Sequence, residues 1–315
     1  MLAACAPDES PWPSRPIKIE VGYPPGGGAD ALARLVASEL GRALDGQVVV
    51  ENRPGSAGTF AAQLVAQAPR DGYTLLVAAT GAVTLAPLLN RALSYAPDKD
   101  LCPLALLGET PHVLLVNAVS PAQSLDELVA LARQHPSALS YASLGQGSSA
   151  HVTGARFASL THIAINHVPY RGSAPAINDL IGGHVSMMFG TLQATLPMIE
   201  SGQVRVLAVS SERRSPKLPS VPTFAEQGFP ELTSTSWYGL FMPCGVPPAV
   251  ARKLDIAARK VVEQGALAAR VEGEGSEFRA LIGQDFARFL DAERARWKSA
   301  SALAGSEVSD DSDQR

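Results

Sequence analysis

Short apolar runs alternate along the chain with segments in which apolar residues recur at helical spacing. Residues 17–23 predict a strand, residues 24–28 a glycine-rich turn, and the following segment a helix. One face of that helix would carry Leu32, Leu35, Val36, Leu40 and Leu44. Because strands and amphipathic helices in this order are typical of parallel sheets covered by helices, the pattern predicts an α/β fold.

The same succession of strand, loop and helix occurs three more times. The further units cover residues 48–68, 139–160 and 163–181, and each has a loop rich in Gly, Ser or Pro. Additional strands are predicted over residues 73–78, 113–116, 204–210 and 237–242, and additional helices over residues 124–134 and 286–297. Two of the four units lie before residue 70 and the other two after residue 138.

Length and composition favour a two-domain globular protein. The chain has 315 residues, which suits two packed units of roughly 150 residues each. No stretch approaches the roughly 20 apolar residues that span a bilayer. The formal charge of -4 and scattered Lys and Arg argue against nucleic-acid binding, which needs a basic surface. Residues 1–15 and 304–315 bury too little apolar surface, so we expect a flexible leader and a disordered acidic tail.

The three cysteines are too few and too widely spaced for a metal cage or a disulfide-dense scaffold. The segment LAAC, which ends at Cys5, resembles the end of a bacterial lipoprotein signal, in which the cysteine is lipidated. The charged and apolar regions that precede such a cysteine are missing, so an accidental match is the alternative. Cys102 and Cys244 could form a disulfide in an oxidising compartment or remain two buried thiols.

Each of the four loops follows a strand and directly precedes a helix. Unpaired backbone N–H groups and the positive end of the helix dipole favour an anion there, and glycine lets the backbone approach it. Micromolar affinity needs roughly 8 kcal/mol, whereas one charge-assisted hydrogen bond contributes roughly 1.5–3 kcal/mol. Several loops must therefore converge on one ligand, which predicts a carboxylate or phosphate site in a cleft that closes between two lobes.

A dinucleotide site is the main alternative. Residues 26–31, GGGADA, fit the pattern G-x-G-x-x-A after a strand, and Glu51 lies about 20 residues further on, at the end of the next strand. Two features weaken this interpretation: Pro24 and Pro25 separate the strand from the glycines, and Glu51 leads into a second glycine-rich loop. An NAD(P)-dependent oxidoreductase is therefore the less favoured function.

Catalytic and metal sites are not indicated. Residues 147–151, GSSAH, resemble a nucleophile elbow, but His151 replaces the final glycine of G-x-S-x-G, so Ser148 is interpreted as a helix cap or a ligand donor. The histidines lack the spacing of metal ligands and are interpreted as surface or core residues: His112, His135, His151, His162, His167 and His184. We expect no enzyme activity, no cofactor and no metal.

Six motifs in a fixed order give the chain a family resemblance. They are RPI at 15–17, YPPGG at 23–27, ENRPG at 51–55, DGYTL at 71–75, HVPYRG at 167–172 and VPT at 221–223. They resemble the Bug, or TctC-like, receptors of tripartite tricarboxylate transporters, over about residues 14–300. The resemblance implies a non-enzymatic solute-binding protein with a two-lobed, type II periplasmic-binding-protein fold and a ligand cleft between the lobes.

The resemblance also implies an organisation and a role. Residues 16–115 plus 237–303 would form lobe 1 and residues 116–236 lobe 2, with crossing strands between them. The protein would be a periplasmic monomer, lipid-anchored if Cys5 is modified, that passes a small carboxylate to membrane permease subunits. A sensory role, in which the closed form docks on a sensor kinase, is an alternative.

Carried over by position, the resemblance places ligand-binding residues on loops of both lobes. They are Tyr23, Pro25, Gly26, Gly27, Asp30, Thr80, Gly81, Ser143, Gly147, Ser148 and His151, with Tyr170 and Arg171 completing the closed cleft. The resemblance implies a ligand from the di- and tricarboxylates, acidic amino acids and related small acids. The family usually has an aspartate where this chain has Ser186. If that position faces the cleft, an acid without an amine is favoured over an amino acid.

Overall fold

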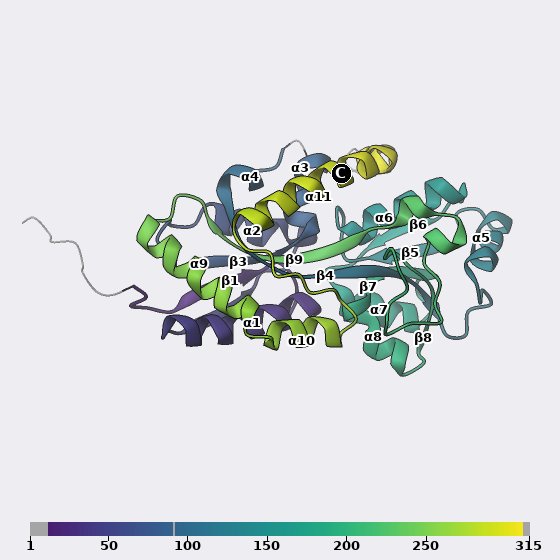
Figure 1. The fold of residues 1–315 in the computed structure, drawn as a ribbon. Coiled ribbons are helices and arrows are strands. Elements are labelled where there is room, and N and C mark those ends of the chain that lie inside the picture. The colour runs from purple at the N-terminus through teal and green to yellow at the C-terminus, as the bar shows by residue number, and fades with distance from the viewer. Residues whose placement is uncertain (1–11, 91, 311–315) are drawn as a thin grey trace, which may run out of the picture.

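The computed structural model describes residues 12–90 and 92–310, with side chains described up to Lys298. Two α/β lobes lie side by side, and long strands pass from one to the other (Figure 1). The strand order is β2-β1-β3-β9-β4-β7-β5-β6, and β8 also pairs with β4. The fold class predicted from the sequence is confirmed.

The first lobe is a sheet covered by helices on both faces. Its strands are β1 (Ile17–Val21), β2 (Val48–Asn52) and β3 (Thr74–Ala79), which are parallel, and β9 (Thr235–Pro243), which is antiparallel to β3. One face is covered by α1 (Gly28–Leu44), α9 (Pro248–Glu263) and α10 (Ala266–Gly273), and the other by α2 (Thr59–Ala66) and α11 (Gln284–Asp310). Because side chains alternate along a strand, Leu75 and Val77 enter the first core and Leu76 and Ala78 the second.

The second lobe repeats this arrangement. Its strands are β5 (Ser140–Ser143), β6 (Asn166–Pro169), β7 (Met187–Thr191) and β8 (Val204–Val209). One core contains residues of α5 (Leu125–Gln134) and α6 (Ser149–Thr161), and the other contains residues of α7 (Ser173–Ile181) and α8 (Leu192–Glu200). The remaining helical segments are short: η1 (Ser56–Gly58), η2 (Gly81–Leu85), α3 (Ala86–Leu89), α4 (Pro97–Asp100), η3 (Ala225–Gln227) and η4 (Pro230–Leu232).

Strand β4 (Leu101–Asn117) belongs to both lobes. It pairs with β9 from Leu101 to Pro111 and with β7 from His112 to Val116. The chain returns from the end of β8 to the start of β9, and in this second connection Ser210 N–H donates to the His112 carbonyl. These two connections join the lobes, and we call them the hinge. The predicted lobe boundaries after residues 115 and 236 stay a prediction.

A disulfide joins Cys102, at the start of β4, to Cys244, which follows β9. The two Cα atoms are 5.0 Å apart, and 142 positions separate the two cysteines in sequence. The closed loop includes the whole second lobe, so the two connections between the lobes are covalently tied at their first-lobe end. Cys5 lies outside the described residues.

Several elements differ from the prediction, and α9 and α10 have no predicted counterpart. β4 begins at Leu101 rather than near Val113, because register shifts beside Pro103 and Gly108 let the strand pass residues that usually interrupt one. β7 and α8 have no predicted counterpart, since no turn residue separates them. α11 continues to Asp310, into the predicted disordered tail, because extending a helix costs little once it has begun.

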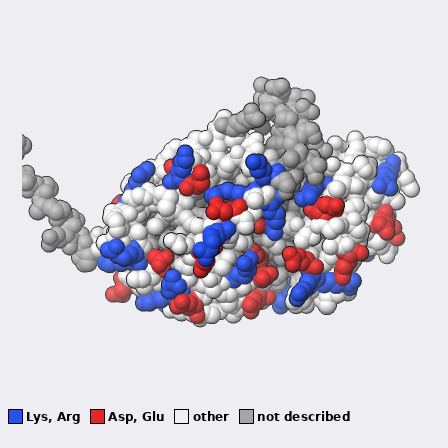
Figure 2. All heavy atoms as spheres, turned by 45° about the horizontal axis from the view of Figure 1, so that its top comes forward, with Lys and Arg blue, Asp and Glu red and all other residues white. Residues whose placement is uncertain are grey.

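The charged side chains are mixed over the surface. Figure 2 shows Lys and Arg interspersed with Asp and Glu on one face. Ion pairs of the protein include Arg15 with Asp71 and Arg214 with Glu226. The face in view therefore has no stripe of one sign. Within the described residues, no helix has both the length and the apolar character that crossing a membrane would require.

Candidate ligand-binding cleft

A pocket lies between the two lobes. The first lobe contributes Tyr23, Pro24, Pro25, Gly27, Gly28, Ala29, Ala79, Ser236 and Tyr238, and the second contributes Leu144, Ser148, Ser149, Gly172, Ser173, Ala174 and Pro175. None of these residues has a charged side chain. The volume of this pocket is about 40 Å³. One water needs roughly 10–15 Å³ on this measure, so the pocket has room for a few waters or a small ligand.

Three helices begin at this pocket. α1 starts at Gly28, α6 at Ser149 and α7 at Ser173, and all three residues line the pocket. The residues before α1 and α7 are Gly27 and Gly172, which provide no side-chain cap. The first-turn N–H groups of these helices can therefore donate to an anion in the pocket. Helix dipoles from both lobes add positive potential at the same place.

Asp30 stabilises the loop before α1. Its carboxylate accepts hydrogen bonds from Gly26 N at 3.0 Å, Arg34 Nε at 2.9 Å and Asn52 Nδ2 at 2.9 Å. Burial favours the neutral acid, but these hydrogen bonds outweigh it and lower the pKa of Asp30. Asp30 and Gly26 do not line the pocket. They support the loop that carries Pro25 and Gly27, and these two residues do line the pocket.

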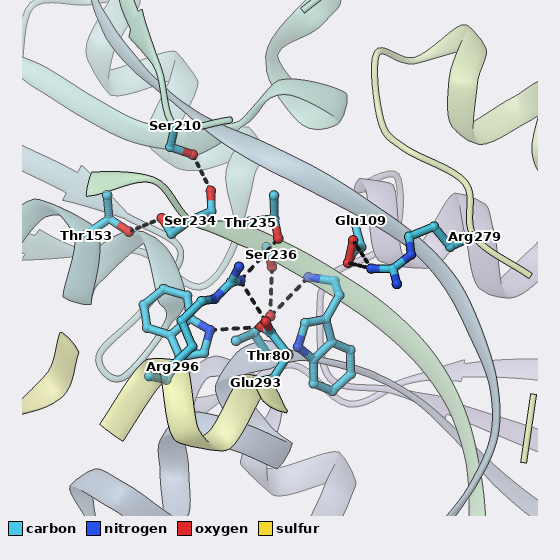
Figure 3. Close-up of polar contacts among 12 residues, drawn as sticks. Thr80, Glu109, Thr153, Ser210, Ser234, Thr235, Ser236, Arg279, Glu293 and Arg296 are labelled. Atoms are coloured by element: carbon cyan, nitrogen blue, oxygen red, sulfur yellow. Dashed lines mark hydrogen bonds and ion pairs between the residues drawn. The ribbon is translucent and has the colours of Figure 1, made fainter. Parts of the chain in front are cut away.

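Thr80 does not line the pocket but contacts residues of β9. Its Oγ1 accepts a hydrogen bond from Trp237 N at 3.0 Å and lies 3.4 Å from Ser236 Oγ (Figure 3). Thr80 is fully buried, whereas Ser236 lines the pocket. Tyr23 lines the pocket. Its hydroxyl also donates to the Ala57 carbonyl at 3.2 Å, which fixes the position of the ring. Burial raises the pKa of Tyr23, so the phenol remains neutral.

The loop before α6 is organised by two stacked histidines. The rings of His151 and His167 have centroids 4.0 Å apart, and His167 Nε2 lies 2.7 Å from Ser143 Oγ. His151 Nδ1 accepts from Gly147 N at 3.2 Å, and Ser148 Oγ accepts from His151 N at 3.2 Å. Burial, with a smaller contribution from His151, lowers the pKa of His167 to about 3. Of these predicted residues only Ser148 lines the pocket, while the others fix its position.

Tyr170 and Arg171 do not line the pocket. The Tyr170 hydroxyl donates to Asp179 Oδ2 at 2.5 Å within the second lobe, and Arg171 is exposed. Gly172, the next residue, does line the pocket. The HVPYRG motif therefore contributes the backbone of Gly172 to the pocket. A direct ligand contact by Tyr170 or Arg171 stays a prediction.

The lobes approach each other closely around the pocket. A Cβ atom built on Gly172 would lie 2.9 Å from Pro24 Cδ, and one on Gly28 would lie 2.7 Å from Gln193 Oε1. Gly81 is similarly close, because its Cβ would lie 3.5 Å from the Gly147 carbonyl oxygen. Since each pair joins opposite lobes, the lobes are in close contact around the pocket, and glycine permits this approach.

Twelve pocket residues lie outside the set predicted from sequence, and four of these carry a hydroxyl group: Ser149, Ser173, Ser236 and Tyr238. Ser149 and Ser173 lie within predicted loops, and their position next to the start of a helix was the available signal. Ser236 and Tyr238 are on β9, far along the chain from the four loops. No local pattern marks them, because only the pairing of β9 with β3 and β4 brings them to the pocket.

The residues behind the alternative functions have other roles. Glu51, the acidic residue of the dinucleotide pattern, pairs with Lys18 at 2.7 Å and Arg53 at 2.8 Å. Ser148 of the elbow-like segment caps α6. Within the described ranges, no group of three or more His, Cys, Asp and Glu side chains could hold a metal ion.

Ser186 does not face the pocket, so the condition of the specificity argument is not met. Its hydroxyl accepts a hydrogen bond from Ser140 N at 3.2 Å, just before β7, whose paired strand β5 runs parallel toward the pocket. Ser186 is therefore at the amino end of the sheet, opposite the pocket-forming loops. The missing aspartate cannot select between an amino acid and an acid without an amine.

The two-lobed α/β fold, with an uncharged pocket at helix amino termini from both lobes, defines a solute-binding protein of the periplasmic-binding-protein class. The chain belongs to the TctC family, the receptors of the tripartite tricarboxylate transporter family. The model of this family matches residues 32–303. The family resemblance predicted from sequence is confirmed. This is a family of substrate-binding receptors and not of enzymes.

Three known proteins illustrate the relationship. Protein BugT of Bordetella pertussis is 34% identical over 298 residues, which cover 94% of this chain and 91% of BugT. The structure of R. palustris Rpa4515 with adipate is 34% identical, has a TM-score of 0.88 and covers 93% of this chain and 98% of its own. MatC from Rhodopseudomonas palustris with bound malate is 32% identical, has a TM-score of 0.86 and covers 92% and 99%.

Proposed function

We propose that the protein captures a small dicarboxylate by closing its lobes around it. The observation that supports this most directly is the convergence of three helix amino termini, from both lobes, on one uncharged pocket. The structures of Rpa4515 with adipate and MatC with malate support the same ligand class. Both proteins exceed 30% identity to this chain and match it over almost their full length.

Recognition of charge would rest on backbone donors and hydroxyl groups. Charge-assisted hydrogen bonds contribute roughly 1.5–3 kcal/mol each, so four or five of them, less the cost of association, suit micromolar affinity. The amides following Gly27 and Gly172 would bind the carboxylates, helped by Ser148 and Ser173. The apolar walls formed by Tyr23, Pro25 and Pro175 would enclose the carbon chain between the carboxylates.

The closed protein would act outside the cytoplasm and deliver its ligand to the membrane subunits of a tripartite tricarboxylate-type transporter. The family match supports this role. The Cys102–Cys244 disulfide supports an oxidising compartment such as the periplasm. A lipid anchor at Cys5 stays a prediction, because that residue lies outside the described ranges.

Isothermal titration calorimetry of the full chain tests the proposal. We expect at least one of adipate, malate and succinate to bind with one-to-one stoichiometry and a micromolar dissociation constant. Propionate, which has a single carboxylate, is the matched control and should bind at least tenfold more weakly. The proposal is refuted if none of the diacids binds below about 1 mM, or if NADH is the tighter ligand.

A further inference from the structure

His112 occupies the point at which the central strand changes lobes. Pro111 is the last residue of β4 that pairs with β9, and His112 is the first that pairs with β7. The His112 side chain is completely buried. His112 therefore lies in the connection between the lobes, where β4 changes its pairing partner.

The backbone of His112 also holds the second hinge connection. His112 N–H donates to Ser210 Oγ at 2.7 Å, and the Ser210 N–H donates to the His112 carbonyl at 2.9 Å. The Ser210 hydroxyl then donates to the Ser234 carbonyl, and Ser234 Oγ lies 3.4 Å from Thr153 Oγ1 of α6 (Figure 3). The two connections and α6 therefore share one buried hydrogen-bond network, in which small displacements are costly.

The imidazole of His112 extends from this network to the pocket. Its Nε2 lies 2.9 Å from Ser149 Oγ, and Ser149 is the first residue of α6 and lines the pocket. Burial lowers the pKa of His112 to about 4, so the ring is neutral at physiological pH. Because a serine hydroxyl has a single proton, Ser149 can donate to an acid and keep this contact only when the Nε2–H of His112 donates to Ser149 Oγ. Ser149 thus has its side-chain orientation set by a residue of the hinge.

We propose that His112 is a positioning residue that fixes the Ser149 hydroxyl for the ligand and couples occupancy of the pocket to the hinge. This inference rests on the proposed function, because it assigns a role in binding the same acid. A ligand that hydrogen-bonds Ser149 favours the rotamer that contacts His112. Through the two bonds between His112 and Ser210, that contact stabilises the relative orientation of the connections found in the closed form.

Two substitutions of His112 separate positioning from packing. His112→Gln can keep a polar atom near Ser149, whereas His112→Leu keeps the bulk and removes the contact. Thr195→Val is the matched control, because Thr195 is also fully buried in the second lobe but hydrogen-bonds only carbonyl groups of residues 191 and 192. Thermal unfolding checks that all variants are folded at the assay temperature.

The first readout needs no ligand. Hydrogen exchange of the His151 and Val152 amides, in the first turn of α6, should accelerate about tenfold in His112→Leu, the value of one lost hydrogen bond. It should change less than threefold in His112→Gln and Thr195→Val. Equal exchange in His112→Leu and the unaltered protein would overturn the positioning role, whether or not an acid binds.

The second readout is the affinity for adipate, malate and succinate. His112→Leu and Ser149→Ala should each weaken binding about tenfold, and the double variant should be no more than threefold weaker than either, because both changes remove one shared contact. Additive losses, or unchanged affinity in His112→Leu, would refute the coupling while leaving the proposed function intact. Failure of the unaltered protein to bind any diacid would refute the proposed function, and the exchange experiment would still decide the positioning role.

Discussion

Replacing Gly172 by alanine tests whether ligand binding requires the two lobes to lie as close together as they do in this structure. Gly172 has a φ of 161°, an extended conformation that alanine adopts freely, so the substitution introduces no backbone strain. The new Cβ would lie 2.9 Å from Pro24 Cδ on the opposite lobe, where ordinary contacts begin near 3.4 Å. Overpacking of this kind costs roughly 1–3 kcal/mol, and only the closed form would incur it.

The expected result is a loss of affinity without a loss of stability. A penalty of about 1–3 kcal/mol on closure weakens binding roughly fivefold to 150-fold, measured by calorimetry with the tightest-binding diacid. The unfolding free energy of the ligand-free protein should change by less than about 0.5 kcal/mol, because the lobes can separate. Gly273→Ala is the control, since no atom lies within 4 Å of its added Cβ. Unchanged affinity in Gly172→Ala would refute the reasoning.

Three further predictions concern stability. Reducing the Cys102–Cys244 disulfide, which closes a loop of 142 positions, should lower the unfolding free energy by roughly 4–5 kcal/mol in denaturant titrations, and an unchanged midpoint would contradict this. Asp30→Asn should cost about 1–3 kcal/mol at pH 7. Because the pKa of Asp30 is lowered in the folded protein, the stability gained from its ionised form is present above the ordinary value of 3.8 and lost as the pH falls through the folded pKa. The difference between the two proteins should therefore shrink in acid, and a constant difference would argue against the assignment. Burial lowers the pKa of His112 to about 4 and of His167 to about 3, from 6.5. Stability should therefore be full above pH 6.5 and fall below it by up to about 1.4 kcal/mol per pH unit for each histidine, and His167→Gln should remove one histidine's share of that slope.

The sequence predicts the parts of the molecule that depend on local chemistry. The strand over 17–23, the glycine turn and the apolar face from Leu32 to Leu44 correspond to β1, its loop and α1, because side-chain periodicity and glycine act within a few residues. The loops after β5 and β6 are found in the same way, and they supply Ser148 and Gly172.

The remaining features depend on contacts between distant segments. Register shifts beside Pro103 and Gly108 are invisible to periodicity, so the length of β4 is underestimated. Ser236 and Tyr238 reach the pocket through the pairing of β9. His112 contacts Ser149, 37 positions away, and is indistinguishable in sequence from a core histidine. Ser143 and His151 are carried over by position from the family but support the loop without lining the pocket, because a position in the sequence does not record which way a side chain points.

The absence of charged side chains from the pocket lining has a consequence for how such a protein changes its ligand. If amide groups of the main chain hold the negative ends of the guest, point mutations can alter the size and curvature of the enclosure without removing its preference for acids. Descendants of one gene could therefore come to prefer shorter, longer or hydroxylated acids by exchanging wall residues such as Tyr23, Leu144 and Pro175, while every intermediate still retains an acid.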